Sequence, residues 1–405
     1  MDIQAFQGLA PAGERANQVN CVPYDVVDTK EARQISQGNP YSLLHVDRAE
    51  MDLPDGTDIY SDVVYAKAKG NFLHLQKTGA LVREKTPCVY VYRQIMGIHT
   101  QTGLAVACSV KDYEENLIKK HEKTRPDKED DRTRLIDTIG AQTGPVFLTY
   151  HDNAEVDALT ARVTKNAPTY DFTAPDGVRH MVWRVAGGED FVRAFAKIPA
   201  VYIADGHHRA ASAARVAKER QKRNPSHTGK EPYNYFLGVL FPSSQVKILP
   251  YNRCVHDLNG LSVEKFLAAV KAVFPLQENA LPQPEKSGQV RMYVQGKWHG
   301  LVCSAPANAD AVSRLDVSVL QDKLLAPILD IQDPRTSKRI DFVGGIRGTE
   351  ELVRKVDSGQ AAVAFSMFPT TVEQMMAIAD AGQIMPPKST WFEPKLRSGF
   401  FVHTF

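Results

Sequence analysis

The sequence has few cysteines, no long apolar run and almost no net charge. Its five cysteines are scattered, and no two are spaced as C-x-x-C, which excludes a visible disulfide framework or structural zinc site. No stretch of about 18 apolar residues is present to span a bilayer. The N-terminus also lacks the basic start and apolar core of a signal peptide. We therefore expect a cytoplasmic protein that does not engage membranes.

The charge balance argues against a nucleic-acid partner. Lysine and arginine number 49 against 47 aspartate and glutamate residues, so the formal net charge is only +2. Such a chain has no general attraction for a phosphate backbone, and its C-terminal half contains no helix-turn-helix pattern. Neither a P-loop nor a G-x-G-x-x-G sequence is present, which excludes the usual P-loop and Rossmann modes of nucleotide binding.

Length and pattern predict two domains of mixed class. With 405 residues, 43% of them hydrophobic, the chain can form two or three cores. Helical and strand-like patterns alternate along it, so we expect an α/β fold with α+β character. We place the boundary near residue 250, which gives domains at 1–250 and 251–405.

Several elements can be assigned from periodicity and composition. Apolar residues at helical spacing predict three helices, at 60–78, 262–274 and 315–328. β-Branched and aromatic runs predict two strand pairs, 88–96 with 103–110 and 235–241 with 246–251.

The most informative stretch is VYIADGHHRAASAARV, at residues 201–216. An apolar strand enters an Asp-Gly turn, and an alanine-rich helix begins at once. The turn gathers polar side chains at the amino end of that helix: Asp205, His207, His208 and Arg209. Free backbone N–H groups and the helix dipole make such an end an anion site. Gly206 permits close approach of a ligand to the backbone, and Arg209 is a bidentate phosphate donor, so we infer a phosphate site.

A second interpretation of this turn remains open. Asp205 is then the N-cap of the helix, the histidines are surface residues and Arg209 pairs with a carboxylate. Under the phosphate interpretation, Asp205 binds Mg²⁺ or orients a histidine. Adjacent histidines point about 100° apart on a helix, so they do not form the usual metal-binding pair.

A second polar constellation is HEKTRPDKEDDR, at residues 121–132. Pro126 interrupts any helix between its two halves. Taken alone, such a run of charges is typical of a solvated loop that opens a charged helix.

A third stretch, MPPKSTWFEPK at residues 385–395, lies near the C-terminus. Its two prolines are rigid and extended, so Lys388 is held where it can reach a phosphate, and Ser389 or Thr390 can hydrogen-bond to it. The alternative is a structural crossing in which the following aromatic side chains fill the core and the lysine is exposed.

These segments resemble the bacterial and archaeal family numbered 1015 among the domains of unknown function. The resemblance covers nearly the whole chain and is carried by PYDVV (23–27), GNPYSLLH (38–45), KKHEKTRPDKEDDR (119–132), DGHHR (205–209) and MPPKSTWFEPKLRSG (385–399). The strand–turn–helix corner is also similar to that of ParB, sulfiredoxin and the free-serine kinases, in whose superfamily it binds nucleotide or substrate phosphate. The resemblance implies a ParB/sulfiredoxin-like N-terminal domain followed by a second mixed α/β domain.

The free-serine kinases carry a histidine–glutamate pair before their first recognition helix, and the resemblance gives Glu122 their role of catalytic base. It also implies that Arg125 and Arg132 bind phosphates and that His121 orients the base or a phosphate oxygen. One departure is the insertion of about 70 residues between this segment and DGHHR, which is longer than in those kinases.

We therefore expect a small-molecule kinase that uses ATP or ADP with Mg²⁺ to phosphorylate a hydroxylated metabolite, free serine being the leading candidate. The candidate catalytic residues are Glu122, Asp205 and His207, and Asp205 is also the candidate metal ligand. The candidate cofactor-binding residues are His121, Thr124, Arg125, Arg132, Gly206, His208, Arg209, Lys388, Ser389 and Thr390. A ParB-like nucleotide-binding switch and a phosphometabolite sensor without catalysis are the alternatives, and the sequence leaves a homodimer open.

Overall fold

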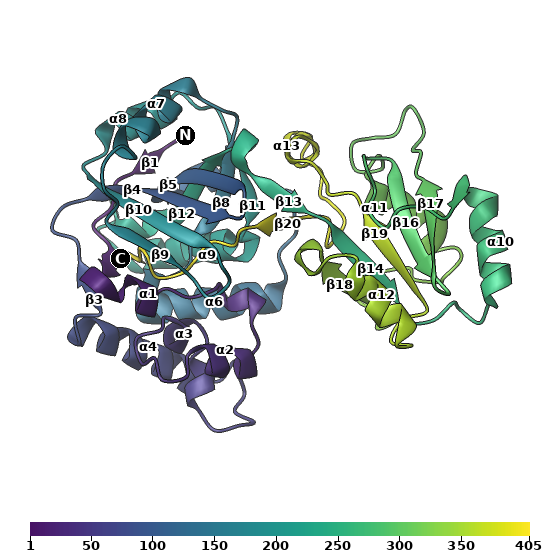
Figure 1. The fold of residues 1–405 in the computed structure, drawn as a ribbon. Helices are drawn as coiled ribbons and strands as arrows, with labels where there is room; N and C mark the ends of the chain where they lie inside the picture. The colour runs from purple at the N-terminus through teal and green to yellow at the C-terminus, as the bar shows by residue number, and fades with distance from the viewer. The chain divides into compact units, whose positions relative to one another are not determined.

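The computed structural model describes residues 1–405, and the chain divides into two compact units. Unit 1 comprises Met1–Val246 and Pro394–Phe405, and unit 2 comprises Lys247–Glu393. The predicted second domain contains the whole C-terminus, whereas the last residues of the chain return to unit 1 through backbone pairing with its N-terminal segment. Both termini therefore lie in unit 1 (Figure 1). Each unit combines helices and strands, which confirms the mixed α/β class.

Unit 1 is built on a nine-stranded mixed sheet. Its order is β6-β11-β8-β12-β5-β4-β10-β9, and β1 also pairs with β5. Two neighbouring pairs, β6 with β11 and β8 with β12, are parallel, and the others are antiparallel. The strands are β1 (Ile3–Gln4), β4 (Cys88–Met96), β5 (His99–Ser109), β6 (Ile118–Lys119), β8 (Val146–Tyr150), β9 (Tyr170–Thr173), β10 (Arg179–Ala186), β11 (Val201–Asp205) and β12 (Tyr235–Pro242). Small two-stranded sheets join β2 (Leu9–Pro11) with β3 (Leu81–Arg83), and β7 (Ala141–Gln142) with β21 (His403–Thr404).

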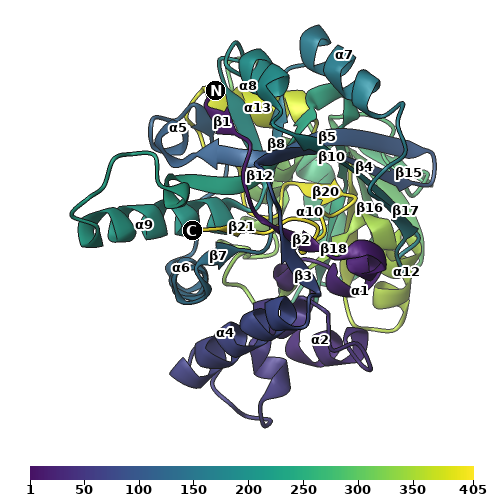
Figure 2. The same cartoon turned by 90° about the vertical axis from the view of Figure 1, so that its left-hand side faces the viewer.

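Helices of unit 1 pack in layers, and the first of them, α9 (His207–Arg223), packs on the sheet. The helices are α1 (Ala16–Val19), α2 (Thr29–Ile35), α3 (Leu44–Asp47), α4 (Asp62–Lys77), α5 (Val110–Glu114), α6 (Pro126–Ile139), α7 (Ala154–Val163), α8 (Glu189–Phe195) and α9 (His207–Arg223). Buried alanines of α9, such as Ala210 and Ala213, join the core of the sheet because their small side chains allow close packing. Helix α6 packs against α9, and α4 packs against α6 in turn (Figures 1 and 2).

The predicted elements of unit 1 agree with the structure. Helix α4 occupies the 60–78 segment and buries Val64, Ala68, Phe72 and Leu75, the residues at helical spacing. Strands β4 and β5 form the predicted antiparallel hairpin. Pro126 does not fall inside a helix but opens α6 as one of its first residues, a position where its missing N–H costs nothing.

Ion pairs between α9 and α6 account for the basic end of α9. Arg220 and Arg223 both bind Asp137 of α6, at 2.9 and 3.0 Å. Nearer the start of each helix, Arg215 of α9 binds Asp130 of α6. The basic side chains therefore serve helix packing.

Unit 2 contains a six-stranded antiparallel sheet of order β15-β17-β16-β19-β14-β18. Its strands are β14 (Tyr251–Val255), β15 (Leu276–Glu278), β16 (Gln289–Val294), β17 (Lys297–Val302), β18 (Ile340–Gly344) and β19 (Val363–Met367). Its helices are α10 (Val263–Val273), α11 (Asp316–Leu320), α12 (Glu350–Asp357) and α13 (Val372–Asp380). A separate two-stranded sheet pairs β13 (Lys247–Leu249) with β20 (Trp391–Glu393).

Two predictions fail around unit 2. The segment 246–251 does not pair with 235–241, because β12 is held between β5 and β8 in unit 1 and β13 takes β20 as its partner. The predicted helix at 315–328 is α-helical only as far as Leu320, after which Gln321–Leu325 form a π-helical turn. Apolar periodicity predicts a helix but cannot distinguish its hydrogen-bond spacing. No helix in the chain is both long enough and apolar enough to cross a bilayer.

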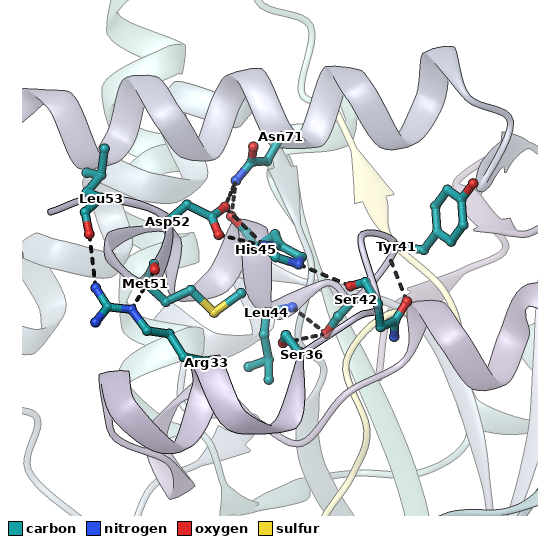
Figure 3. Close-up of polar contacts among 11 residues, drawn as sticks. Arg33, Ser36, Tyr41, Ser42, Leu44, His45, Met51, Asp52, Leu53 and Asn71 are labelled. Carbon is teal, nitrogen blue, oxygen red and sulfur yellow. Dashed lines mark hydrogen bonds and ion pairs between the residues drawn. The ribbon is translucent and has the colours of Figure 1, made fainter.

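A compact polar cluster links helices α3 and α4 of unit 1. His45 of α3 contacts both oxygens of Asp52 through Nδ1, at 2.9 and 3.0 Å, and its Nε2 lies 3.1 Å from the carbonyl oxygen of Asn39 (Figure 3). Asn71 of α4 donates to Asp52 at 2.8 Å. Carboxylate and carbonyl oxygens only accept, so the imidazolium form of His45 satisfies both contacts. Burial lowers the pKa of His45, but the hydrogen bond and charge of Asp52 outweigh it, and the pKa lies above 6.5.

This cluster predicts a stability that depends on pH. Stabilisation by His45 is complete below its unfolded pKa of about 6.5 and is lost as pH rises through its higher folded pKa. The pKa of Asp52 is lowered in the fold, so its contribution is lost only in acid. His45→Gln should therefore reduce the free energy of unfolding by about 1 kcal/mol more at about pH 5.5 than at about pH 8.5, measured by urea unfolding. His74→Gln, at an exposed position of α4, is the control; a His45→Gln effect that is equal at the two pH values would contradict the assignment.

Candidate functional site

The corner between β11 and α9 has an open helix end. Gly206 is the N-cap residue of α9, with φ 93°, and no side chain caps the helix. The alternative in which Asp205 is the N-cap is therefore wrong. A Cβ at position 206 would lie only 3.1 Å from Cζ of Arg209. The positive φ would also strain any residue other than glycine, so both the contact and the backbone conformation favour glycine here. Gly206 itself has no side chain to accept from the first-turn amides of α9.

Asp205 ends β11 and faces two cations. Its Oδ2 lies 3.3 Å from Nη2 of Arg209 and 3.7 Å from Nζ of Lys395. Burial raises the pKa of the Asp205 carboxyl, but the charges of Lys395 and Arg209 reverse the effect and hold it at about 2. Asp205 is therefore ionised at neutral pH.

Arg209 is buried, with 8% of its side chain exposed. Its Nη1 donates to the carbonyl oxygen of Pro145, and its Nη2 contacts both Asp205 and Asp25, the latter at 3.5 Å. Both terminal nitrogens thus have acceptors within the protein. This geometry matches the second interpretation of the turn, in which Arg209 pairs with carboxylates.

Two buried histidines line the approach to Glu122. The rings of His121 and His207 meet edge to face, with centroids 4.5 Å apart. Nε2 of His207 accepts from the backbone N–H of His121 at 3.4 Å, and its Nδ1 lies 3.6 Å from Oε2 of Glu122. Burial lowers the pKa of His121 to about 4 and that of His207 well below its ordinary value, so both are neutral at pH 7. Because Nε2 of His207 accepts, its proton is on Nδ1 and faces Glu122.

The rest of the HEKTR segment wraps the same helix end. The backbone N–H of Arg125 donates to Nε2 of His208 at 3.0 Å. The guanidinium of Arg125 is 70% exposed and pairs with Asp127 at 2.9 Å. The hydroxyl of Thr124 donates to Glu129 at 2.9 Å. The structure thus brings residues 121–125 and 205–209 together, as the catalytic assignment requires.

Arg132 is held among the helices rather than presented at this corner. It binds Asp131 at 2.8 Å, donates to the carbonyl oxygen of Asp47 at 3.2 Å and lies over the ring of Tyr24 at 4.1 Å. Only 10% of its side chain is exposed. Its ion pair lies within α6, and its hydrogen bond to Asp47 links α6 to α3.

Lys388, Ser389 and Thr390 belong to unit 2. Lys388 is exposed and has φ 58°, and its carbonyl oxygen accepts from Nη2 of Arg253 at 3.1 Å. The hydroxyl of Ser389 donates to Pro386 O at 2.6 Å. Thr390 is partly exposed. The Ser389 hydroxyl is therefore engaged within the loop.

Residues 3–318 match the family described as "Protein of unknown function (DUF1015)". The chain belongs to this family. No curated protein matches it in sequence.

Solved structures with a similar course of chain include a C-terminally truncated SbnI from Staphylococcus aureus, 12% identical over 74% of this chain and 87% of that one, with a TM-score of 0.41. A free serine kinase variant in complex with AMP is 14% identical over 73% and 92%, with a TM-score of 0.37. A conserved hypothetical protein from Pyrococcus furiosus is 16% identical over 73% and 95%, with a TM-score of 0.36.

Two charged residues of this DUF1015 chain that are not among the predicted site residues reach the corner. Asp25 contacts Arg209 from the PYDVV segment, and Lys395 contacts Asp205 from the end of MPPKSTWFEPK. Each lies in a stretch that carries the family resemblance. Their sequence distance from DGHHR is too great for spacing alone to bring them together.

Mg²⁺ fits Asp205 only with help from a phosphate. The structure gathers no group of three His, Cys, Asp or Glu side chains able to hold a metal ion. Magnesium in nucleotide sites is held by one or two carboxylates together with phosphate oxygens and water. The ionised Asp205 meets that requirement, and Asp25 offers a second carboxylate on the same guanidinium nitrogen.

Arg209 is buried and Arg125 is exposed, so their substitution should lower the stability of the protein by different amounts. Arg209→Met removes the buried partner of Asp205 and Asp25 and should lower the free energy of unfolding by about 3 kcal/mol. Arg125→Met removes an exposed pair and should cost less than about 1 kcal/mol. Urea unfolding followed by circular dichroism measures both; equal losses would show that Arg209 is not the centre of a buried network.

Proposed function

We propose that the chain is a kinase that transfers a phosphoryl group from a nucleotide, ATP or ADP, to the hydroxyl of a small metabolite. The observation that carries the proposal is the position of Glu122, which faces Nδ1 of His207 beside the uncapped N-terminus of α9. The motif resemblance to free-serine kinases makes free serine the first acceptor to test. A purely binding site gains little from a carboxylate beside phosphates, because the charges repel.

The anion-binding part of the proposal rests on backbone groups. The first-turn amides of α9 lie at the positive end of the helix dipole, where an anion binds favourably. His208 and the exposed guanidinium of Arg125 border this end. These groups bind and orient the terminal phosphates, whereas Arg209 fixes the corner from beneath.

Glu122 supplies the base. Its side chain is 51% exposed, so a substrate hydroxyl can reach it. The carboxylate accepts the hydroxyl proton, the oxygen forms a bond to the terminal phosphorus, and the bond from that phosphorus to the bridging oxygen breaks, which releases the shortened nucleotide. His207 keeps its proton and directs it at Glu122, which holds the carboxylate in orientation.

Mg²⁺, bound by Asp205 and the phosphates, supplies neutralisation of the phosphate charge. The chain's own part is to keep Asp205 ionised, which Lys395 and Arg209 do through their charges. His121 packs against His207 and excludes water from its inner edge, since only 2% of His121 is exposed.

The test is formation of the shortened nucleotide from ATP or ADP, with and without Mg²⁺, across serine and other small hydroxylated metabolites. Glu122→Gln should reduce acceptor-dependent turnover by about 100-fold or more while nucleotide affinity is retained, because proton abstraction contributes about 10²–10⁴ in rate. Glu14→Gln, at an exposed position, is the control and should leave turnover unchanged.

The outcomes separate an enzyme from the alternatives. Turnover that requires an acceptor and disappears in Glu122→Gln supports the kinase. Tight nucleotide binding without turnover on any acceptor, unaffected by the substitution, would identify a switch or sensor built on the same corner.

A further inference from the structure

Arg253 of β14 is buried in unit 2 without a carboxylate partner, and only 4% of the residue is exposed. Its Nη1 donates to the carbonyl oxygen of Tyr251, and its Nη2 donates to that of Lys388 at 3.1 Å. Both acceptors are uncharged. Burial lowers the pKa of Arg253 to about 10, and only the phenol of Tyr251 opposes this effect. The guanidinium is therefore charged at neutral pH and has no counter-ion within the fold.

This lack of a counter-ion sets Arg253 apart from the buried arginines of unit 1. Arg132 and Arg209 each pair with carboxylates, and a buried charge is costly unless it is paired in this way. A guanidinium has five N–H donors, whereas Arg253 makes two hydrogen bonds. A bidentate oxyanion supplies both the missing negative charge and acceptors for the remaining donors.

Lys388 brings a second cation to the same face of β14. Its Nζ lies 5.4 Å from the ring centroid of Tyr251, which shares a strand face with Arg253 because the two residues are alternate. Phe342 of β18 lies opposite Arg253 in the sheet, and its ring centroid is 5.5 Å from Cζ of the arginine. The rings of Phe342 and Tyr251 meet at 5.8 Å. Two cations are thus gathered beside aromatic rings.

Hydrogen bonds within unit 2 hold the loop that carries Lys388. The hydroxyl of Thr370 donates to the carbonyl oxygen of Ser389 at 3.0 Å, and the hydroxyl of Ser389 donates to that of Pro386 at 2.6 Å. Lys388 has φ 58°, a left-handed conformation that a residue other than glycine keeps only where its surroundings enforce it. Lys388 is exposed and Tyr251 is partly exposed, so solvent reaches the cluster on their side.

We propose that Arg253 and Lys388 form an anion site in unit 2 that binds the phosphate group of a small molecule. A phosphate group carries a charge of about −1.5 to −2 at pH 7, which matches one guanidinium and one ammonium, whereas a carboxylate brings a single charge. Arg253 supplies the bidentate contact, and Lys388 supplies a point charge on the exposed side. The site lies within unit 2 and goes beyond the proposed function, because it requires neither Glu122 nor the start of α9.

Acetylation of lysine side chains in the full chain, followed by mass spectrometry, tests the site directly. An ammonium engaged by phosphate is shielded from the reagent, so saturating inorganic phosphate should slow acetylation of Lys388 by about fivefold or more. Lys271, exposed at the end of α10, is the internal control and should change by less than about twofold. Glycerol 3-phosphate should also protect Lys388 if the ligand is a phosphomonoester, and protection by inorganic phosphate alone would identify the free ion. Equal protection by acetate would overturn the assignment to phosphate.

Substitution of Arg253 separates binding at this site from binding elsewhere. Arg253→Met should abolish the protection of Lys388, and Arg253→Lys, which keeps the charge but not the planar fork, should raise the phosphate concentration for half-protection by about tenfold. Arg335→Met, at an exposed position of unit 2, is the matched control and should leave protection as in wild type. Protection that persists in Arg253→Met would show that Arg253 serves only to fasten the loop.

A crystal soaked with tungstate tests the site without any substitution, because this tetrahedral oxyanion is located by its anomalous scattering. We expect tungsten within about 4 Å of the guanidinium nitrogens of Arg253, as oxyanion hydrogen bonds require. Tungstate bound only at the start of α9 would overturn the unit 2 site and leave the proposed function standing. Tungstate at Arg253 in a protein that phosphorylates no acceptor would support the unit 2 site while the kinase proposal fails.

Discussion

The buried guanidinium of Arg209 is the contact on which the rest of the site depends. It joins three parts of unit 1 that are remote in sequence: Asp25 near the N-terminus, the carbonyl oxygen of Pro145 before β8, and Asp205 at the end of β11. A buried charge is tolerated only when it is paired and hydrogen-bonded. The requirement to satisfy Arg209 therefore fixes the turn that opens α9, the helix end that we propose as the phosphate site.

The charged residues of the site differ in role according to how deeply they are buried. Arg209 and Arg132 are inside and hold helices and strands in place, whereas Arg125 is exposed and Lys395 lies at the edge. Glu122 is half exposed, and its Oε2 lies 3.6 Å from Nδ1 of the neutral His207. An exposed carboxylate that a substrate hydroxyl can reach is able to accept a proton, which is the property that the proposed base needs.

Local patterns in the sequence predict much of this fold and part of the site. The strand–turn–helix corner, helix α4 and the β4–β5 hairpin follow from periodicity and turn residues, because their hydrogen bonds are made within a few dozen residues. The pairing of β13 with β20 could not be predicted, since the two strands are separated by most of unit 2. The same reason hides Asp25 and Lys395. The pairing of Arg209 with a carboxylate was one of two alternatives for the turn, but a sequence pattern does not show which carboxylate will lie beside an arginine.

A crystal structure of the chain with Mg²⁺ and a non-hydrolysable ATP analogue would show directly whether this helix end binds phosphate. We expect the terminal phosphate to lie about 3 Å from the backbone nitrogens at the start of α9, with Glu122 on the open side of that phosphate and Arg209 still bound to its carboxylates. A nucleotide bound elsewhere, with the amides of His207 and His208 making no contact to it, would contradict the central claim that this helix end is the phosphate site.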